Sequence, residues 1–194
     1  MTISFSSSGF RNITISGKVA VGSTTLFNGL REKLSPLGWQ FFSGGEFTRE
    51  YAVKNNLFPK ESRKHHAATV YSDEFDREVD TLIRKKLEEE SHLVIESDLA
   101  GFNAQNIPSV LKILLVCDDA LRIDRLVNRD NITIEEAKKH LKIREEENTK
   151  KWQRLYGRYD FWDPKFYDLI IDTYKHSPIE TLNLVLDKIG YSQR

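Results

Sequence analysis

The fold is decided by the stretch Ile13-Thr14-Ile15-Ser16-Gly17-Lys18-Val19-Ala20-Val21-Gly22-Ser23-Thr24-Thr25-Leu26. A β-branched segment leads into a turn bounded by two glycines, and three hydroxyl residues then open a helical pattern. Strand, loop and helix in this order are typical of a phosphate-binding loop, where glycines let backbone N–H groups point inward at an anion. The helix adds its positive N-terminal end to the same site. The stretch therefore predicts a phosphate site, the alternative being a glycine-containing turn without a ligand.

One position of this loop departs from the usual pattern G-x-x-x-x-G-K-[ST]. Ser23 stands where the pattern has a lysine, which normally reaches the β- and γ-phosphates. Lys18, directly after the first glycine, can supply the missing cation, and Thr24 occupies the position whose hydroxyl holds Mg²⁺. The residues predicted to cradle the phosphates are Gly17, Lys18, Val19, Ala20, Val21, Gly22, Ser23, Thr24 and Thr25.

The composition is that of a soluble globular protein, with 194 residues that fit a single domain. The 29 basic and 29 acidic residues balance, so we expect no nucleic-acid or membrane partner, and a polyanionic ligand needs local basic clusters. Cys117 is the only cysteine, which excludes a disulfide framework and favours the cytoplasm. No apolar run is long enough to span a bilayer, and residues 1–9 predict a flexible tail rather than a signal peptide. We expect a monomer or a weak homo-oligomer.

Strand and helix patterns alternate along residues 10–194, which predicts an α/β domain with a parallel sheet. Strands are expected in the segment before the loop and over residues 39–42, 93–95, 110–116 and 169–171. Thr133 and Glu136 predict a capping box that opens a long helix to about residue 156. The other helices are expected over residues 24–34, 46–55, 60–71, 73–90 and 119–128, and after Ser177-Pro178.

Three groups of arginines can serve phosphoryl transfer, which needs a clamp for the acceptor and cations around the moving group. Arg49, just after the second strand, can grip an acceptor phosphate with its planar fork, or lie exposed on a helix. Arg125 and Arg129 share one helical face with Arg122, which is either a phosphate-facing row or a solvated face. The long helix carries Arg144 and Lys151 in a mixed-charge pattern typical of an exposed helix, or of a basic lid that closes over phosphates.

Asp98 follows the third strand, at the sheet edge where ligands bind in open α/β sheets. It can orient Mg²⁺, bond a ribose or a base, or cap a turn.

These motifs together resemble the cytidylate kinase family of nucleoside monophosphate kinases, most closely its archaeal-type branch, from about residue 13 to residue 173. That family also replaces the loop lysine by a small hydroxyl residue. The motifs that carry the resemblance are Gly22-Ser23-Thr24-Thr25, Ser43-Gly44-Gly45-Glu46-Phe47-Thr48-Arg49-Glu50, Phe75-Asp76-Arg77-Glu78-Val79-Asp80, Arg122 with Arg125 and Arg129, Arg144-Glu145-Glu146, Tyr156-Gly157, and Tyr167-Asp168-Leu169-Ile170-Ile171-Asp172-Thr173.

The resemblance implies a three-layer P-loop kinase fold with a central five-stranded parallel sheet, acceptor-binding helices over about 44–90 and a lid over about 129–160. It implies transfer of the γ-phosphoryl of ATP, with Mg²⁺, to a nucleoside monophosphate, CMP or dCMP first. Arg49 and Arg77 would hold the acceptor phosphate, and Lys18, Arg125, Arg129, Arg144 and Lys151 would surround the transferring group. A small-molecule kinase and an inactive nucleotide-binding regulator are the alternatives.

Two positions depart from the family pattern, and both lie on the acceptor side. The family has Glu-Gly-Arg-Leu-Ala after the third strand, whereas Asp98 replaces the arginine here. The family's Arg-Tyr pair in the lid is Lys151-Trp152. Asp98 is therefore expected either to be neutralised by Arg77 or another cation, or to face a base amino group or a ribose hydroxyl, and a contact with a base amino group would favour cytosine or adenine over uracil.

Overall fold

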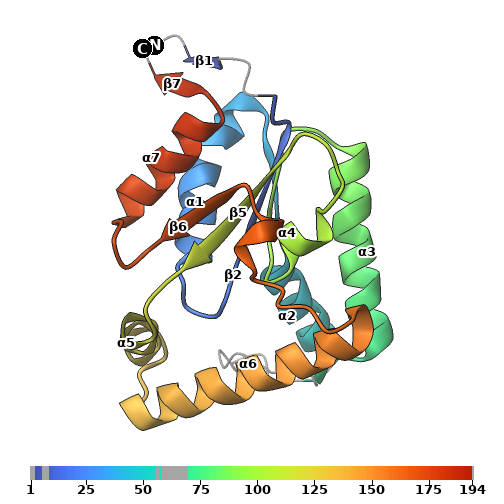
Figure 1. The fold of residues 1–194 in the computed structure, drawn as a ribbon, viewed down its shortest axis with the longest axis vertical. Helices are drawn as coiled ribbons and strands as arrows, with labels where there is room; N and C mark the ends of the chain where they lie inside the picture. The colour runs from blue at the N-terminus through green and yellow to red at the C-terminus, as the bar shows by residue number, and fades with distance from the viewer. Residues whose placement is uncertain (1–2, 6–8, 56, 58–69, 194) are drawn as a thin grey trace.

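The computed structural model of the chain describes residues 3–5, 9–55, 57 and 70–193 (Figure 1). The helix expected over residues 60–71 falls almost entirely outside these residues. Among the described residues, no helix has both the length and the apolar character that crossing a membrane requires.

The core of the fold is a five-stranded sheet in the order β3-β4-β2-β5-β6, with every neighbouring pair parallel. Its strands are β2 (Asn12–Gly17), β3 (Gln40–Ser43), β4 (Leu93–Glu96), β5 (Val110–Val116) and β6 (Leu169–Asp172). The strand that precedes the glycine loop is therefore central, and its neighbours β4 and β5 lead in opposite directions across the sheet. This is the topological switch point at which α/β sheets bind ligands.

Helices cover both faces of the sheet and give the three layers that the sequence predicts. Alternate residues of β2 point to opposite faces: Ile13 and Ile15 pack with α1 (Ser23–Leu34) and α7 (Pro178–Lys188). On the other face, Ser16 accepts a hydrogen bond from the backbone N–H of Gly101 in α4 (Ala100–Asn103). The α3 helix (Asp73–Glu89) packs on that same side through apolar residues at helical spacing.

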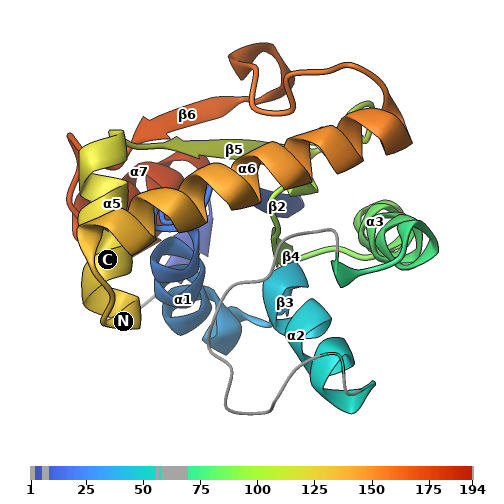
Figure 2. The same ribbon diagram turned by 90° about the horizontal axis from the view of Figure 1, so that it is seen from below.

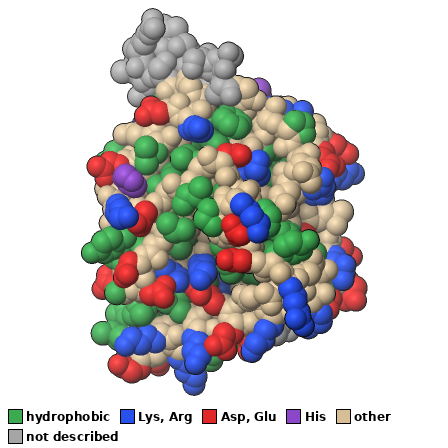
Figure 3. Space-filling model, viewed as in Figure 1, with side chains coloured by type: hydrophobic (Ala, Val, Ile, Leu, Met, Phe, Trp, Pro, Cys, Tyr) green, Lys and Arg blue, Asp and Glu red, His purple; other side chains and the backbone are tan. Residues whose placement is uncertain are grey.

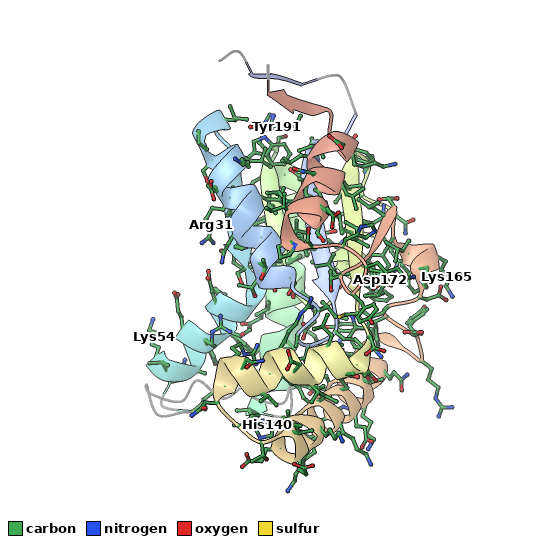
Figure 4. The ribbon with its side chains drawn as sticks, turned by 90° about the vertical axis from the view of Figure 1, so that its left-hand side faces the viewer. Arg31, Lys54, His140, Lys165, Asp172 and Tyr191 are labelled. Carbon is green, nitrogen blue, oxygen red and sulfur yellow. The ribbon has the colours of Figure 1, made fainter. Side chains whose placement is uncertain are left out.

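The remaining helices lie near the carboxyl ends of the strands. They are α2 (Gly44–Lys54), α5 (Asp119–Asp130) and α6 (Ile134–Tyr156). The predicted capping box opens α6, because Thr133 and Glu136 bond each other's backbone N–H groups. Figure 2 shows α6 as one long helix that runs from α5 to α3, and Figure 4 labels His140, an exposed residue of α6.

Residues 3–5 and 191–193, from opposite ends of the described sequence, pair with each other. β1 (Ile3–Phe5) pairs antiparallel with β7 (Tyr191–Gln193), beside the main sheet. Residues 3–5 of the expected tail thus form a strand, and their pairing partner lies at the far end of the sequence, where no local pattern reveals it.

Candidate active site

A cavity of about 690 Å³ opens at the carboxyl ends of the strands. The glycine loop, α2, α3, α5, α6 and the segments after β4 and β6 all contribute to its lining. Basic and acidic side chains lie intermixed over the molecular face shown in Figure 3, consistent with the zero net charge. The cavity, rather than a surface patch of one charge, is therefore the candidate site.

The loop after β2 has the backbone of an anion-binding nest. A Cβ on Gly17 would lie 2.6 Å from Val21 Cγ2 and 2.7 Å from the Leu115 carbonyl oxygen, so only glycine fits there. Ala20 and Gly22 both have positive φ, 62° and 100°. For Ala20 this left-handed conformation is strained by roughly 1–3 kcal/mol, and such strain is concentrated at functional sites. Backbone N–H groups turned inward by these residues form a concavity for phosphate.

The start of α1 is also prepared for an anion. Its N-cap is Gly22, which makes no side-chain cap, and its first turn carries no acidic residue. The other helices of eight or more residues in the described part of the chain each have a side-chain cap. The free N–H groups of α1 therefore remain available to a ligand, as the sequence predicts.

Two arginines of α5 brace the loop from behind. Arg122 Nε donates to the Val19 carbonyl oxygen at 2.8 Å, and Arg125 Nη1 donates to that of Ala20 at 3.1 Å. Arg125 also bonds the hydroxyl and carbonyl of Thr173, each at 3.1 Å. Arg125 lines the cavity as predicted. Its hydrogen bonds attach it to the loop and to the segment after β6, so it is part of the fixed wall rather than of a lid that moves. Arg129 lines the cavity from an exposed position and pairs with Asp130.

Lys18 lies where the sequence analysis places the substitute cation. Its side chain lines the cavity and is 45% exposed, so the ammonium group can reach a ligand. The Nζ atom lies 3.7 Å from Glu145 Oε2 and 5.5 Å from the centre of the Trp162 ring.

Glu96, at the end of β4, is a site residue that the sequence analysis did not assign. Ser23 and Ser43 donate to its two carboxylate oxygens at 2.9 Å and 2.8 Å, and burial raises its pKa. Ser23 thus uses its hydroxyl to tie the loop to β4. The sequence did contain a signal for this role: Glu96 ends the apolar strand Leu93-Val94-Ile95. In P-loop enzymes an acidic residue at the end of a strand helps to hold Mg²⁺.

The donor atoms near Glu96 suit a magnesium ion. Hydroxyl and carboxylate oxygens are the ligands that Mg²⁺ prefers. Thr24 lines the cavity one residue beyond Ser23, with its side chain exposed. No cluster of three or more His, Cys, Asp or Glu residues among those described could hold a metal by itself. The residues present therefore fit Mg²⁺ that arrives with a nucleotide rather than a protein cage.

Arg77, which was expected to hold the acceptor phosphate, is not among the described residues that line the cavity. Arg77 is exposed on α3, whereas Asp76, Val79 and Asp80 line the cavity. Because residues three and four apart share a helical face, the neighbouring position points about 100° away. Arg49 does line the cavity, beside Gly45 at the start of α2, and its side chain is exposed.

Lys151 does not project into the cavity. It is 3% exposed and lies 2.8 Å from Asp76 Oδ2, and it donates to the Tyr71 carbonyl oxygen at 2.7 Å. Seven residues of helix separate it from Arg144, roughly 10 Å along the axis, which carries it over the start of α3. The structure therefore places Lys151 against the start of α3, and its role as a lid cation around the moving phosphoryl group stays a prediction.

The half of the cavity lined by α2, α3, α6 and the segment after β4, here called the acceptor half, is rich in carboxylates. Asp98 lines it and pairs with Arg144 at 3.8 Å, and burial raises its pKa. Asp80 accepts hydrogen bonds from Asn103 Nδ2, at 2.7 Å, and from the Tyr156 hydroxyl. Burial raises the pKa of Asp80 to about 6, against the lowering effect of these two bonds.

The end of the cavity beyond the loop contains an unpaired hydroxyl. Thr173, His176, Pro178 and Thr181 line it, near Arg125. Thr181 is 4% exposed and its Oγ1 has no hydrogen-bond partner. A buried polar atom without a partner costs free energy, so a ligand that bonds it would be favoured here.

Comparison with known proteins agrees with this geometry. Residues 12–175 match the profile of the Cytidylate kinase-like family. A cytidylate kinase of Pyrococcus furiosus is 38% identical over 186 residues, which cover 92% of this chain and 91% of the relative. One from Haloarcula marismortui is 30% identical over 177 residues, covering 91% and 88%.

Solved structures show the same fold at low sequence identity. An uncharacterized protein from Eubacterium ventriosum superposes with a TM-score of 0.67 at 17% identity, covering 92% of this chain and 98% of that one. A shikimate kinase from Acinetobacter baumannii, in complex with shikimate, gives 0.53 at 18% identity, covering 92% of each chain. These likenesses concern the fold alone.

Proposed function

Because the chain belongs to the cytidylate kinase-like family, we propose that it transfers the γ-phosphoryl group of ATP to a nucleoside monophosphate, with CMP or dCMP preferred. The observation that carries the proposal is the cavity itself. An anion-binding loop and an uncapped helix lie at one end, and an acceptor region built from α2, α3 and α6 lies at the other. Phosphoryl transfer needs this juxtaposition more than it needs covalent catalysis.

At the donor end, the backbone of Gly17 to Thr25 would bind the ATP phosphates. Lys18 would supply the cation that Ser23 does not, and Arg129 would approach from α5. Thr24, supported by Glu96, would hold Mg²⁺, which neutralises charge on the phosphates when bound. The unpaired Thr181 hydroxyl offers a hydrogen bond to the donor base.

At the acceptor end, Arg49 would hold the acceptor phosphate and Arg144 would stabilise the transferring group. No general base is required, because the phosphate of a nucleoside monophosphate is already an anion. The residues would act by orientation and by electrostatic stabilisation within a cavity that excludes water. We place the reaction in the cytoplasm, since the single cysteine suits a reducing compartment.

The test is a coupled assay of ADP formation with MgATP and CMP, dCMP, UMP, AMP or GMP. We expect turnover with CMP or dCMP above the other three, and the nucleoside diphosphate identified as product. Thr24→Ala, prepared in parallel, should lose most of this activity, which separates it from a contaminating kinase. Absence of turnover with all five acceptors would remove the proposed function.

One observation favours a second candidate, a kinase of a hydroxyl- or amine-bearing small molecule. Four carboxylates, Asp76, Asp80, Glu96 and Asp98, line the cavity, and an aspartate suits such an acceptor better than a phosphate. A thermal-shift competition panel with MgATP present distinguishes the candidates. Stabilisation by CMP supports the nucleotide kinase, and stabilisation by non-phosphorylated compounds alone supports the second candidate. ATP binding without transfer to any acceptor would indicate an inactive regulator.

A further inference from the structure

We infer that Glu145 of α6 is a positioning residue, which fixes Lys18 beside the phosphate loop and ties the lid helix to that loop. The inference rests on the proposed function and adds to it a residue that does not touch the nucleotide.

The need for such a residue follows from Lys18 itself. A lysine ends a flexible four-carbon stem and carries its charge as a compact point. Unlike the lysine that usually follows the second glycine of a phosphate loop, Lys18 follows the first. Its side chain is nearly half exposed, so packing alone does not fix the ammonium group. A fixed neighbour of opposite charge can restrict it.

Glu145 is that neighbour, and it is itself held in place. Its Oε2 atom lies 3.7 Å from Lys18 Nζ, and its Oε1 atom accepts from Arg122 Nη2. Arg122 is 3% exposed and bonds two further acceptors: the Val19 carbonyl oxygen at 2.8 Å and Asp119 Oδ1 at 2.6 Å. The contacts form a closed ring from Lys18 through Glu145 and Arg122 to Val19, the next residue of the loop.

The position of the Glu145 carboxylate decides whether it supports Lys18 or competes with a bound phosphate for it. A carboxylate inside the cavity would compete with phosphates for Lys18. Lys18 and Arg144 line the cavity, whereas Glu145 is not among the described residues that do. The carboxylate therefore contacts the ammonium group from outside the cavity lining, where it can hold Lys18 without occupying the space of a ligand.

The same turn of α6 serves both halves of the cavity. Arg144, adjacent to Glu145, reaches toward Asp98 at 3.8 Å. The contacts of Glu145 with Arg122 of α5 and with Lys18 of the loop therefore also fix the position of Arg144 in the acceptor half. Loss of this anchor should reduce the rate of transfer more than the binding of either nucleotide, because Lys18 and Arg144 are proposed to act on the transferring group.

The experiment compares steady-state kinetics of Glu145→Gln with the wild type and with Glu146→Gln, a control at the next, exposed position of α6. We expect Glu145→Gln to lower kcat about tenfold or more with KM for both substrates little changed, as for loss of an interaction made mainly in the transition state. Glu146→Gln should match the wild type. Glu145→Asp, which keeps the charge on a shorter side chain, should recover part of kcat.

A double variant tests the link to Lys18. If Glu145 acts partly through Lys18, Glu145→Gln should lower kcat by a smaller factor in the Lys18→Ala background than in the wild type, and the factor that remains reflects Arg144. Unchanged kcat in Glu145→Gln, a lower KM for ATP, or full additivity with Lys18→Ala would each overturn the inference. Should Glu145→Gln fail to fold, the same cycle with Glu145→Asp decides in its place. An inactive wild type would instead be a failure of the proposed function, so the two failures are distinguishable.

Discussion

The donor half and the acceptor half of the cavity differ in the charged groups that line them. The donor half presents free backbone N–H groups at the start of α1, and Lys18 lies beside them. In the acceptor half, Arg144 is paired with Asp98, and Asp80 is buried with a raised pKa. The donor half thus relies mainly on backbone N–H groups, whereas the acceptor half combines the arginines Arg49 and Arg144 with several carboxylates.

This difference indicates which half of the cavity should discriminate between nucleotide bases and which should not. A triphosphate binds by charge and by backbone N–H groups, which do not depend on the identity of the base. Carboxylates, by contrast, can only accept hydrogen bonds when ionised, so they discriminate between ligand edges. Specificity for the acceptor should therefore depend on aspartates, while the rate of transfer should depend on the cations around the loop.

The largest expected effect tests the donor half. Lys18→Ala should reduce kcat by about 10²-fold or more, the order seen when one preorganised donor to the transition state is removed. Steady-state assays with MgATP and CMP measure it, with Lys142→Ala, exposed on α6, as the matched control. Normal turnover of Lys18→Ala, together with a solvent-directed Lys18 in an ATP complex, would show that the loop works with its N–H groups and arginines alone.

The second prediction tests the charge of the acceptor half through stability. The folded chain keeps the Asp80 proton up to about pH 6, whereas the pKa of an ordinary aspartate is 3.8. Between these values the folded state binds more protons than the unfolded state, so ionisation of Asp80 lowers stability as pH rises. A shift of about two units corresponds to about 3 kcal/mol.

Asp80→Asn removes this ionisation. Between pH 4 and pH 7 the wild type should therefore lose about 2–3 kcal/mol more of its free energy of unfolding than Asp80→Asn does. Urea unfolding at several pH values measures the difference. Glu78→Gln, exposed on the same helix, is the control and should follow the wild type. Parallel pH profiles for Asp80→Asn and the wild type would mean that Asp80 is not held protonated by burial.

How far the sequence predicts the molecule differs between these halves as well. The sheet, the long capped helix and the phosphate loop follow from local patterns, since apolar runs, caps and glycines act within a few residues. The structure places Arg49, Arg144 and Lys18 in the cavity as those patterns suggest.

The roles of Arg77, Lys151 and Glu96 were not predictable in the same way. The exposed position of Arg77 was not predictable because packing decides which face of α3 points inward, and it turns Asp76 and Asp80 toward the cavity. The buried position of Lys151 was not predictable because its partner Asp76 is 75 residues away on another helix. Glu96 gains its role from Ser23, 73 residues distant. Contacts of this range are set by tertiary structure rather than by local pattern.

The smallest expected effect, on Asp98, is the most informative about the acceptor. An ionised carboxylate accepts from the exocyclic amino group of cytosine and is repelled by the carbonyl that uracil carries there, a distinction worth about 1–3 kcal/mol for a well-placed contact. Arg144 already compensates part of the charge of Asp98, which reduces its repulsion of an acceptor phosphate. Asp98→Asn should therefore lower the ratio of kcat/KM for CMP to that for UMP by about tenfold, with KM for ATP unchanged.

The measurement is the pair of kcat/KM values, with Asp124→Asn, exposed on α5, as the control. An unchanged ratio with equal gains on both acceptors would mean that Asp98 serves only as the counter-ion of Arg144, because its removal would then free that arginine for any phosphate. We would in that case look for selectivity in Asp80 and its partners Asn103 and Tyr156, a second carboxylate-centred contact set of the acceptor half.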